Sequence, residues 1–204
     1  MNAARPLEPG QHAVGATFGG AVLDAGFVTT PMPNLNVEGR SGVTSFMDRP
    51  VELNYGLNVT GIAFGLGSAH IGGAWLAMEQ DGARPALALV DRVHLTSNVF
   101  DTTKDTKDVM AIMQLEALAS WDTKPALLYV GAAQYLQFSN PMLTLTPVVG
   151  TELHLGQKWG LQVEFRHYAI TQNKEPLNTV TWKTWGPGAY GVTVGFNRAI
   201  GGAE

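Results

Sequence analysis

Hydrophobic residues alternate with polar or small residues along most of this chain, and a period of two predicts β-strands. The clearest case is 51–60, where apolar residues occupy every second position from Val51 to Val59. Similar alternation occurs near 13–19, 35–40, 87–96, 111–121, 143–154, 161–166 and 190–197. Two further segments, 67–79 and 126–138, are apolar but alternate less clearly. The pattern predicts about ten strands, with eight as the alternative if these two segments are not strands.

Turn-forming residues separate the expected strands, and no long segment has the period of a helix. Short turns are expected at 80–82, 122–125, 139–141 and 156–158, which contain Gly, Pro, Asn or Asp. Longer connections are expected at 24–33, 100–108 and 171–187. Evenly spaced strands of this kind favour an all-β fold, a single antiparallel up-and-down β-barrel. We expect an extended N-terminal arm at 1–10, the barrel at 11–198 and a short tail at 199–204.

The composition narrows the class of protein. Charged residues make up 15% of the 204 residues, against roughly 25% in ordinary soluble domains. This low charge argues against a coiled coil and against disorder. A net charge of -4 without a Lys/Arg cluster argues against nucleic-acid binding. The chain has no cysteine, so disulfides and thiolate metal sites are excluded.

The polar face of the strands carries Gly, Thr, Asn, Gln and Ser with few charges, whereas soluble barrels expose many Lys and Glu. This composition suits a narrow polar lumen inside a barrel whose apolar face meets lipid. The outward face would then include Leu161, Val163 and Phe165, and Asp91 is a charged exception on it. A soluble, lipocalin-like barrel that binds an apolar ligand is the alternative. The expected lumenal polar network comprises Glu38, Arg40, Glu52, Arg92, Glu116, Glu152, His154, Glu164 and Arg166.

Aromatic residues lie largely near the ends of the expected strands. Rings of Trp and Tyr favour the level of the lipid headgroups, and strands of about 9–11 residues can cross the hydrocarbon when tilted. We therefore expect a transmembrane barrel. Its membrane-interface aromatics would be Tyr55, Trp75, Trp121, Tyr135, Trp159, Tyr190 and Phe196.

The whole pattern from 11 to 198 resembles the small bacterial outer-membrane β-barrel proteins of eight to ten strands. Its most specific part is the last strand, AYGVTVGF (189–196), which is similar to the C-terminal signal of that group, although eight residues follow Phe196. The resemblance implies a bacterial outer-membrane location, contact with outer-membrane lipid, and contacts with other envelope proteins through the loops or the N-terminal arm. Members normally carry a signal peptide and some a lipidated cysteine. The start of this chain shows neither, so the alternatives are a cytosolic protein and a trimmed, mature chain. The resemblance favours the trimmed chain, and a lipoprotein cut after its cysteine is one form of it.

A local resemblance points to a different function. The segment LQVEFRHY (161–168) is similar to the late strand of outer-membrane lipid A deacylases, and it implies His167 with Glu175 as part of a hydrolytic site. The serine of that motif is replaced by Ala169, so no nucleophile stands beside His167. Glu152 and His154 come nearest to a metal pair, but two ligands do not make a site. We therefore expect no cofactor and no metal, and a non-enzymatic, structural or interaction role in the cell envelope.

Overall fold

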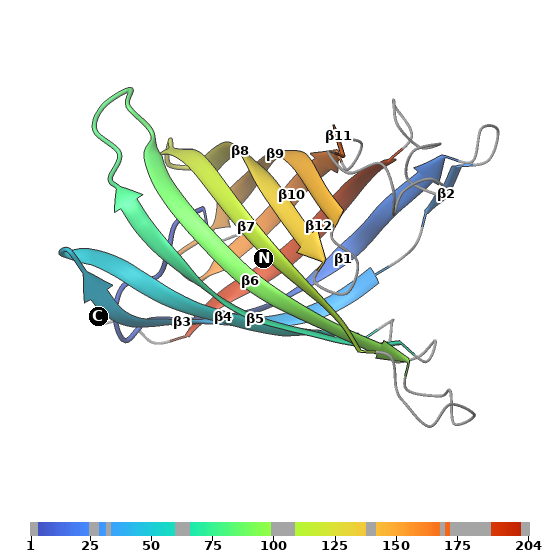
Figure 1. Cartoon of the computed structure of the whole chain (residues 1–204). Coiled ribbons are helices and arrows are strands. Elements are labelled where there is room, and N and C mark those ends of the chain that lie inside the picture. The colour runs from blue at the N-terminus through green and yellow to red at the C-terminus, as the bar shows by residue number, and fades with distance from the viewer. Residues whose placement is uncertain are drawn as a thin grey trace.

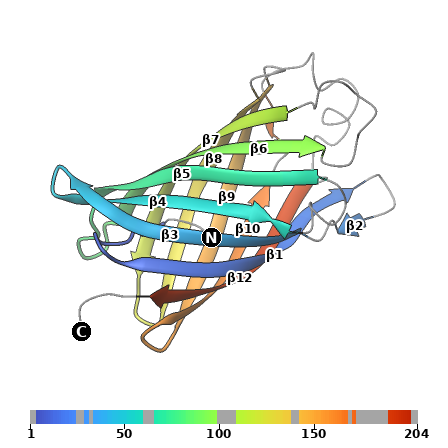
Figure 2. The same cartoon turned by 90° about the horizontal axis from the view of Figure 1, so that it is seen from below.

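The computed structural model describes residues 4–24, 29–31, 34–59, 66–98, 109–137, 142–167, 170–171 and 189–200. Ten strands within these ranges form a closed barrel (Figures 1 and 2). They are β1 (His12–Asp24), β3 (Asn34–Phe46), β4 (Arg49–Asn58), β5 (Leu66–Met78), β6 (Ala86–Asn98), β7 (Val109–Asp122), β8 (Ala126–Gln137), β9 (Met142–Leu155), β10 (Trp159–His167) and β12 (Ala189–Ile200). No helix in the described ranges is long and apolar enough to cross a membrane.

Each of the ten strands pairs antiparallel with its neighbours in the chain, and β12 closes the barrel against β1. Two short strands, β2 (Thr29–Pro31) and β11 (Ile170–Thr171), extend the edges of β1 and β9. The expected up-and-down barrel of ten strands is confirmed. The alternative of eight is wrong, because both weakly alternating segments form strands, β5 and β8.

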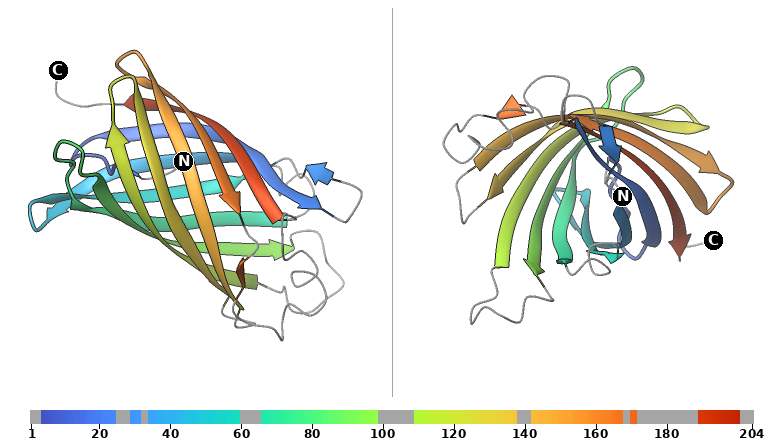
Figure 3. Two further views of the ribbon diagram at one scale, coloured as in Figure 1. Left: turned by 90° about the horizontal axis from the view of Figure 1, so that it is seen from above. Right: turned by 90° about the vertical axis from the view of Figure 1, so that its right-hand side faces the viewer.

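The two ends of the barrel differ in their connections. The turn end, as we call it, holds the first residue of β1, the last residue of β12 and four short connections, at 47–48, 79–85, 123–125 and 156–158. At the first of these, Met47 and Asp48 have φ values of 52° and 58°, which suits the twist of a two-residue hairpin. The loop end carries the segments between the other strand ends, and Figure 3 shows the barrel along and across its axis.

Most large apolar side chains face outward, and most polar side chains of the strands face inward. Val163 and Phe165 are 38% and 40% exposed, whereas Glu164 and Arg166, which alternate with them, are buried. The outward direction expected for these apolar side chains is confirmed. A soluble barrel needs the opposite arrangement, with its apolar face inside. The alternative of a soluble, lipocalin-like barrel is therefore not supported, and the polar side chains gather in the lumen.

Candidate functional site: the lumen of the barrel

The lumen collects charged side chains from most of the strands. Six of the nine residues expected there are buried: Arg40, Glu52, Arg92, Glu116, Glu164 and Arg166. The other three line lumenal cavities, Glu38 toward the loop end and Glu152 and His154 toward the turn end. The structure does not join all nine into one network. It divides the hydrogen-bonded charges between two clusters at different levels of the barrel.

The first cluster, the arm cluster, binds the N-terminal arm (residues 4–11) inside the turn end of the barrel. Arg40 donates to Glu52 through two bonds of 2.7 Å, Nε to Oε1 and Nη2 to Oε2. The same Nη2 donates to the carbonyl of Arg5 at 2.8 Å, and the amide of Leu7 donates to Glu52 Oε2 at 2.9 Å. A buried ion pair on β3 and β4 thus holds both a carbonyl and an amide of the arm.

Further contacts fix the arm along its length. Ser120 Oγ donates to the carbonyl of Ala4 at 3.1 Å, and Ala4 itself is buried in the apolar cluster around Leu118 and Tyr129. At the other end of the arm, Gly10 and Gln11 exchange backbone hydrogen bonds with Gly42 of β3. Gly42 has to be glycine here, because a Cβ would overlap the carbonyl of Glu8.

The second cluster, the central cluster, spans the lumen between β6, β7 and β10. Glu116 lies at its centre and is 4% exposed. Its Oε1 accepts from Arg166 Nη2 at 3.1 Å, and its Oε2 lies 3.7 Å from Arg92 Nη1. Gln114 donates to the same Oε2 at 3.0 Å. One carboxylate therefore links two arginines that come from opposite sides of the lumen.

Two tyrosines complete the central cluster. The hydroxyl of Tyr129 donates to Glu164 Oε2 at 3.0 Å and accepts from Gln162 Nε2 at 2.7 Å. Arg166 Nε donates to the other oxygen of Glu164, and its Nη1 donates to the hydroxyl of Tyr135 at 3.0 Å. The expectation that Tyr135 lies at the membrane interface was wrong. Its position in β8 has the same parity as the inward-facing Tyr129, so its ring enters the lumen.

Lumen-facing glycines make the room that these side chains need. The ring of Tyr129 lies against Gly150 of β9, where a Cβ would collide with it. Likewise, a Cβ at Gly160 would meet the side chains of Glu152 and Asn197. The polar side chains can cross a narrow barrel only because some facing positions carry no side chain.

Cavities lie beside both clusters in the described part of the lumen. Toward the loop end, a polar cavity of about 250 Å³ is lined by Glu38, His70, His94 and both arginines of the central cluster. Toward the turn end, cavities of about 370 and 340 Å³ flank the arm. The central cluster and the arm lie between the cavity toward the loop end and the two toward the turn end.

The comparisons with known proteins agree with this architecture. No protein-family model matches the sequence, and no curated protein matches it either. Among solved structures, an outer-membrane channel from Pseudomonas putida F1 is similar over 98% of this chain and 99% of its own, with a TM-score of 0.51 and 11% identity. The translocator domain of the autotransporter NalP from Neisseria meningitidis is similar over 96% of this chain and 90% of its own, with a TM-score of 0.46 and 10% identity. Ail of Yersinia pestis gives a TM-score of 0.32 at 7% identity, over 94% of this chain and 99% of its own.

The chain has the fold of outer-membrane β-barrels. At 11% identity the likeness to the Pseudomonas channel concerns the fold and not the activity. The resemblance to lipid A deacylases stays a prediction. The side chain of His167 and the whole of Glu175 lie outside the described residues, so the structure does not show whether they meet.

The predicted interface aromatics lie mostly on the outer surface. Three tryptophans lie near the turn end: Trp75 donates to the carbonyl of Phe46, Trp121 donates to that of Ala83, and Trp159 lies under the guanidinium of Arg198. Tyr55 and Phe196 are outward-facing and about half exposed, and Tyr55 covers Gly39 on the next strand. The side chain of Tyr190 lies outside the described residues.

Several lumenal residues were not singled out from the sequence. Asn54, Gln114, Gln162 and Tyr129 are all buried in the lumen. Asn54, Gln114 and Gln162 each lie two residues from a predicted inward-facing charge on the same strand. Tyr129 pairs with Gly150, which lies two residues from Glu152. Alternation could therefore have predicted that these side chains face inward. In the described ranges, no group of three or more His, Asp or Glu side chains is arranged to hold a metal ion.

Proposed function

We propose that this protein is an outer-membrane β-barrel that acts without catalysis, as a structural or interaction component of the bacterial cell envelope. The observation that supports this most directly is the filled lumen. The central cluster and the N-terminal arm occupy the space through which a solute would pass, and ten-stranded barrels are narrow to begin with. A barrel closed in this way fits an anchor or a docking platform better than a general pore.

The exterior supports the membrane placement. Strands of 9 to 14 residues are long enough to cross a bilayer when tilted, and their outward side chains are mainly apolar. In barrels of this kind short turns face the periplasm and long loops face outward. We therefore place the turn end and the arm on the periplasmic side, with outer-membrane lipid around the wall.

Partners would then meet the loop end or the outer wall. The arm is an unsuitable partner site in this conformation, because its backbone is already bonded to Arg40, Glu52 and Ser120. A lipid anchor ahead of the arm stays a prediction.

Conductance measurement tests the closed lumen. The purified chain is inserted into planar lipid bilayers, and we expect no stepwise current above the background of the bilayer alone. A variant that loses the central cluster, Glu116→Ala with Arg166→Ala, should conduct if these side chains form the barrier. An open-pore current from the unmodified chain would refute the closed lumen. Recovery of the chain as a folded monomer in detergent-free buffer would refute the membrane placement.

The deacylase alternative has its own assay. Release of fatty acid from lipid A is compared between the unmodified chain and His167→Ala. Equal background values are expected, since Ala169 supplies no nucleophile. Activity that disappears in His167→Ala would replace our proposal with an enzyme.

A further inference from the structure

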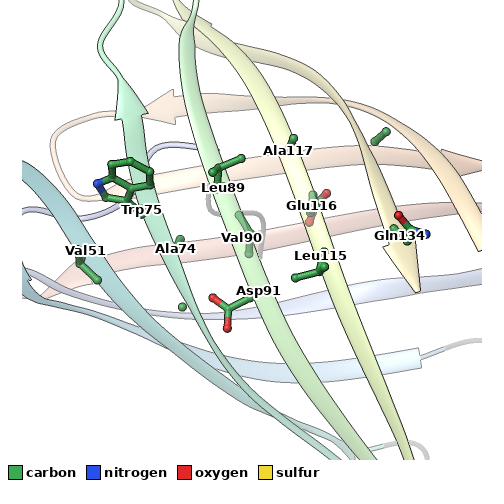
Figure 4. A pocket seen from close by; sticks show the side chains of 12 residues that line it. Val51, Ala74, Trp75, Leu89, Val90, Asp91, Leu115, Glu116, Ala117 and Gln134 are labelled. Carbon is green, nitrogen blue, oxygen red and sulfur yellow. The ribbon is translucent and has the colours of Figure 1, made fainter. Parts of the chain in front are cut away.

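The outer wall has a groove in which its polar exceptions gather. The groove has a volume of about 600 Å³ and crosses β5, β6, β7 and β8. Figure 4 shows Trp75, Leu89, Asp91, Leu115 and Gln134 along it. Asp91 is a charged, outward-facing residue in the middle of β6, and Gln134 is an outward-facing amide on β8. Both fall in this groove.

Asp91 and Gln134 lie in one row across the barrel wall. Gly73 pairs with Asp91, Asp91 with Leu115, and Leu115 with Gln134. Asp91 is the sixth of the 13 residues of β6, so it lies near the middle of the strand. A carboxyl group at that depth faces hydrocarbon, where polar groups are costly unless they are partnered. Within the described ranges, neither the carboxylate of Asp91 nor the side-chain amide of Gln134 has a hydrogen-bonding partner.

The floor of the groove is built from small residues. Gly73, Ala117 and Ala132 line it, while Trp75, Leu89 and Leu115 stand beside them. Small residues at a membrane contact let two backbones approach closely, and polar side chains there hydrogen-bond across the contact. A lipid chain offers no donor or acceptor at this depth. The groove therefore fits a protein surface better than it fits lipid.

We propose that this groove is the contact surface for a second copy of the chain in the membrane. A two-fold contact requires a surface that complements itself. The groove meets this condition because it carries both an acceptor, the carboxylate of Asp91, and a donor, the amide of Gln134, two strands apart. Across a two-fold axis near Leu115, Gln134 of one copy donates to Asp91 of the other, and the reverse bond forms by symmetry. This inference rests on the proposed membrane placement.

Cysteine crosslinking tests this contact directly, because the chain has no native cysteine. Leu115→Cys keeps both polar residues and places one thiol close to the expected axis. Val194→Cys, on β12 across the barrel, is the matched control, since Val194 is also outward-facing and 40% exposed. Both variants are reconstituted into phosphatidylcholine vesicles at low protein density and treated with a short bis-thiol crosslinker.

The proposal expects a crosslinked dimer from Leu115→Cys and at least tenfold less from Val194→Cys. Replacing both polar residues in the Leu115→Cys background, by Asp91→Leu and Gln134→Leu, should reduce the dimer yield about tenfold, the scale of one intramembrane hydrogen bond. Equal yields at the two positions, or none at Leu115→Cys, would overturn it, and a partner from another membrane protein would then be the occupant. Variants that insert into vesicles but stay monomeric refute only the dimer. Variants that never enter vesicles refute the membrane placement itself.

Discussion

Glu116 and Asp91 are two acidic residues on neighbouring strands with opposite environments. Val90 pairs with Glu116 and Asp91 with Leu115, so the two acids are only one step apart in register. Glu116 faces inward and meets Arg92, Arg166 and Gln114. Asp91 faces outward beside Leu89 and Leu115. The wall of the barrel separates a fully partnered carboxylate from one that has no partner in the described chain.

The contrast shows what each face of the wall demands. Buried charges are tolerated inside the lumen because oppositely charged side chains and hydrogen-bond donors from other strands surround them. The outer face has no such supply, so a polar residue there indicates contact with something other than lipid. A carboxylate on the inner face thus holds strands together, whereas the one on the outer face is available to a second barrel.

The largest effect is expected from Glu116→Ala. This change leaves two buried arginines without their shared carboxylate, and removing one partner of a buried ion pair costs about 3–5 kcal/mol. The free energy of unfolding is measured by urea titration of the detergent-solubilised protein, followed by tryptophan fluorescence. Glu116→Gln keeps a hydrogen-bonding side chain of the same shape and should lose less. An unchanged stability for Glu116→Ala would mean that the central cluster does not hold the wall together.

Alternation along the chain, together with the apolar content of 67–79 and 126–138, predicts the strands, their number and the direction of most side chains. It succeeded because residues two apart in a strand share a face, so a few clear positions fix the rest. The same rule predicts Asp91 on the apolar face, and the structure confirms that direction. Tyr135 faces inward because it lies an even number of residues from Tyr129 on the same strand, and its aromatic type does not decide its direction.

The grouping of the lumenal charges could not be predicted from alternation. Whether Glu116 meets Arg92, Arg166 or Arg40 depends on the stagger of strands around the barrel, which a single strand does not encode. The position of the arm was also missed. Residues 4–11 contain Pro6 and Pro9 and no strand pattern, and their binding partners, Arg40, Glu52 and Ser120, lie far away in the sequence.

A second prediction compares steric tolerance on the two faces. Gly150→Ala adds a methyl group where the ring of Tyr129 lies, and overpacking of this kind costs about 1–3 kcal/mol. The outward-facing Val149→Ile, one residue earlier, is the control and should be close to neutral, since its side chain is 48% exposed. Urea titration of both variants gives the difference. Equal stabilities would contradict a tightly filled lumen.

A third prediction concerns a substitution that should raise the free energy of unfolding, whereas Glu116→Ala should lower it. With the copies separated by excess detergent, Asp91→Leu should stabilise the single barrel by about 1 kcal/mol, because it removes an unpartnered carboxyl group from the apolar surface. The measurement is the same urea titration at low protein concentration. A loss of stability would show that Asp91 has a partner within its own barrel, and the contrast with Glu116 would then fail.

The smallest effect on stability is expected for an ion pair at the rim of the barrel, outside both the lumen and the lipid-facing wall. Arg5 of the arm forms an ion pair with Asp122 at the rim of the turn end, where the side chains are 64% and 20% exposed. Exposed pairs contribute about 0.2–1 kcal/mol, so Arg5→Gln should lower the free energy of unfolding by that amount at most. The loss should shrink further in high salt, because salt screens exposed charges, whereas the loss in Glu116→Ala should persist. A large loss of stability in Arg5→Gln that salt does not change would mean that this side chain anchors the arm as firmly as Arg40 and Glu52 do. The screened interior of the lumen would then extend to the rim of the turn end.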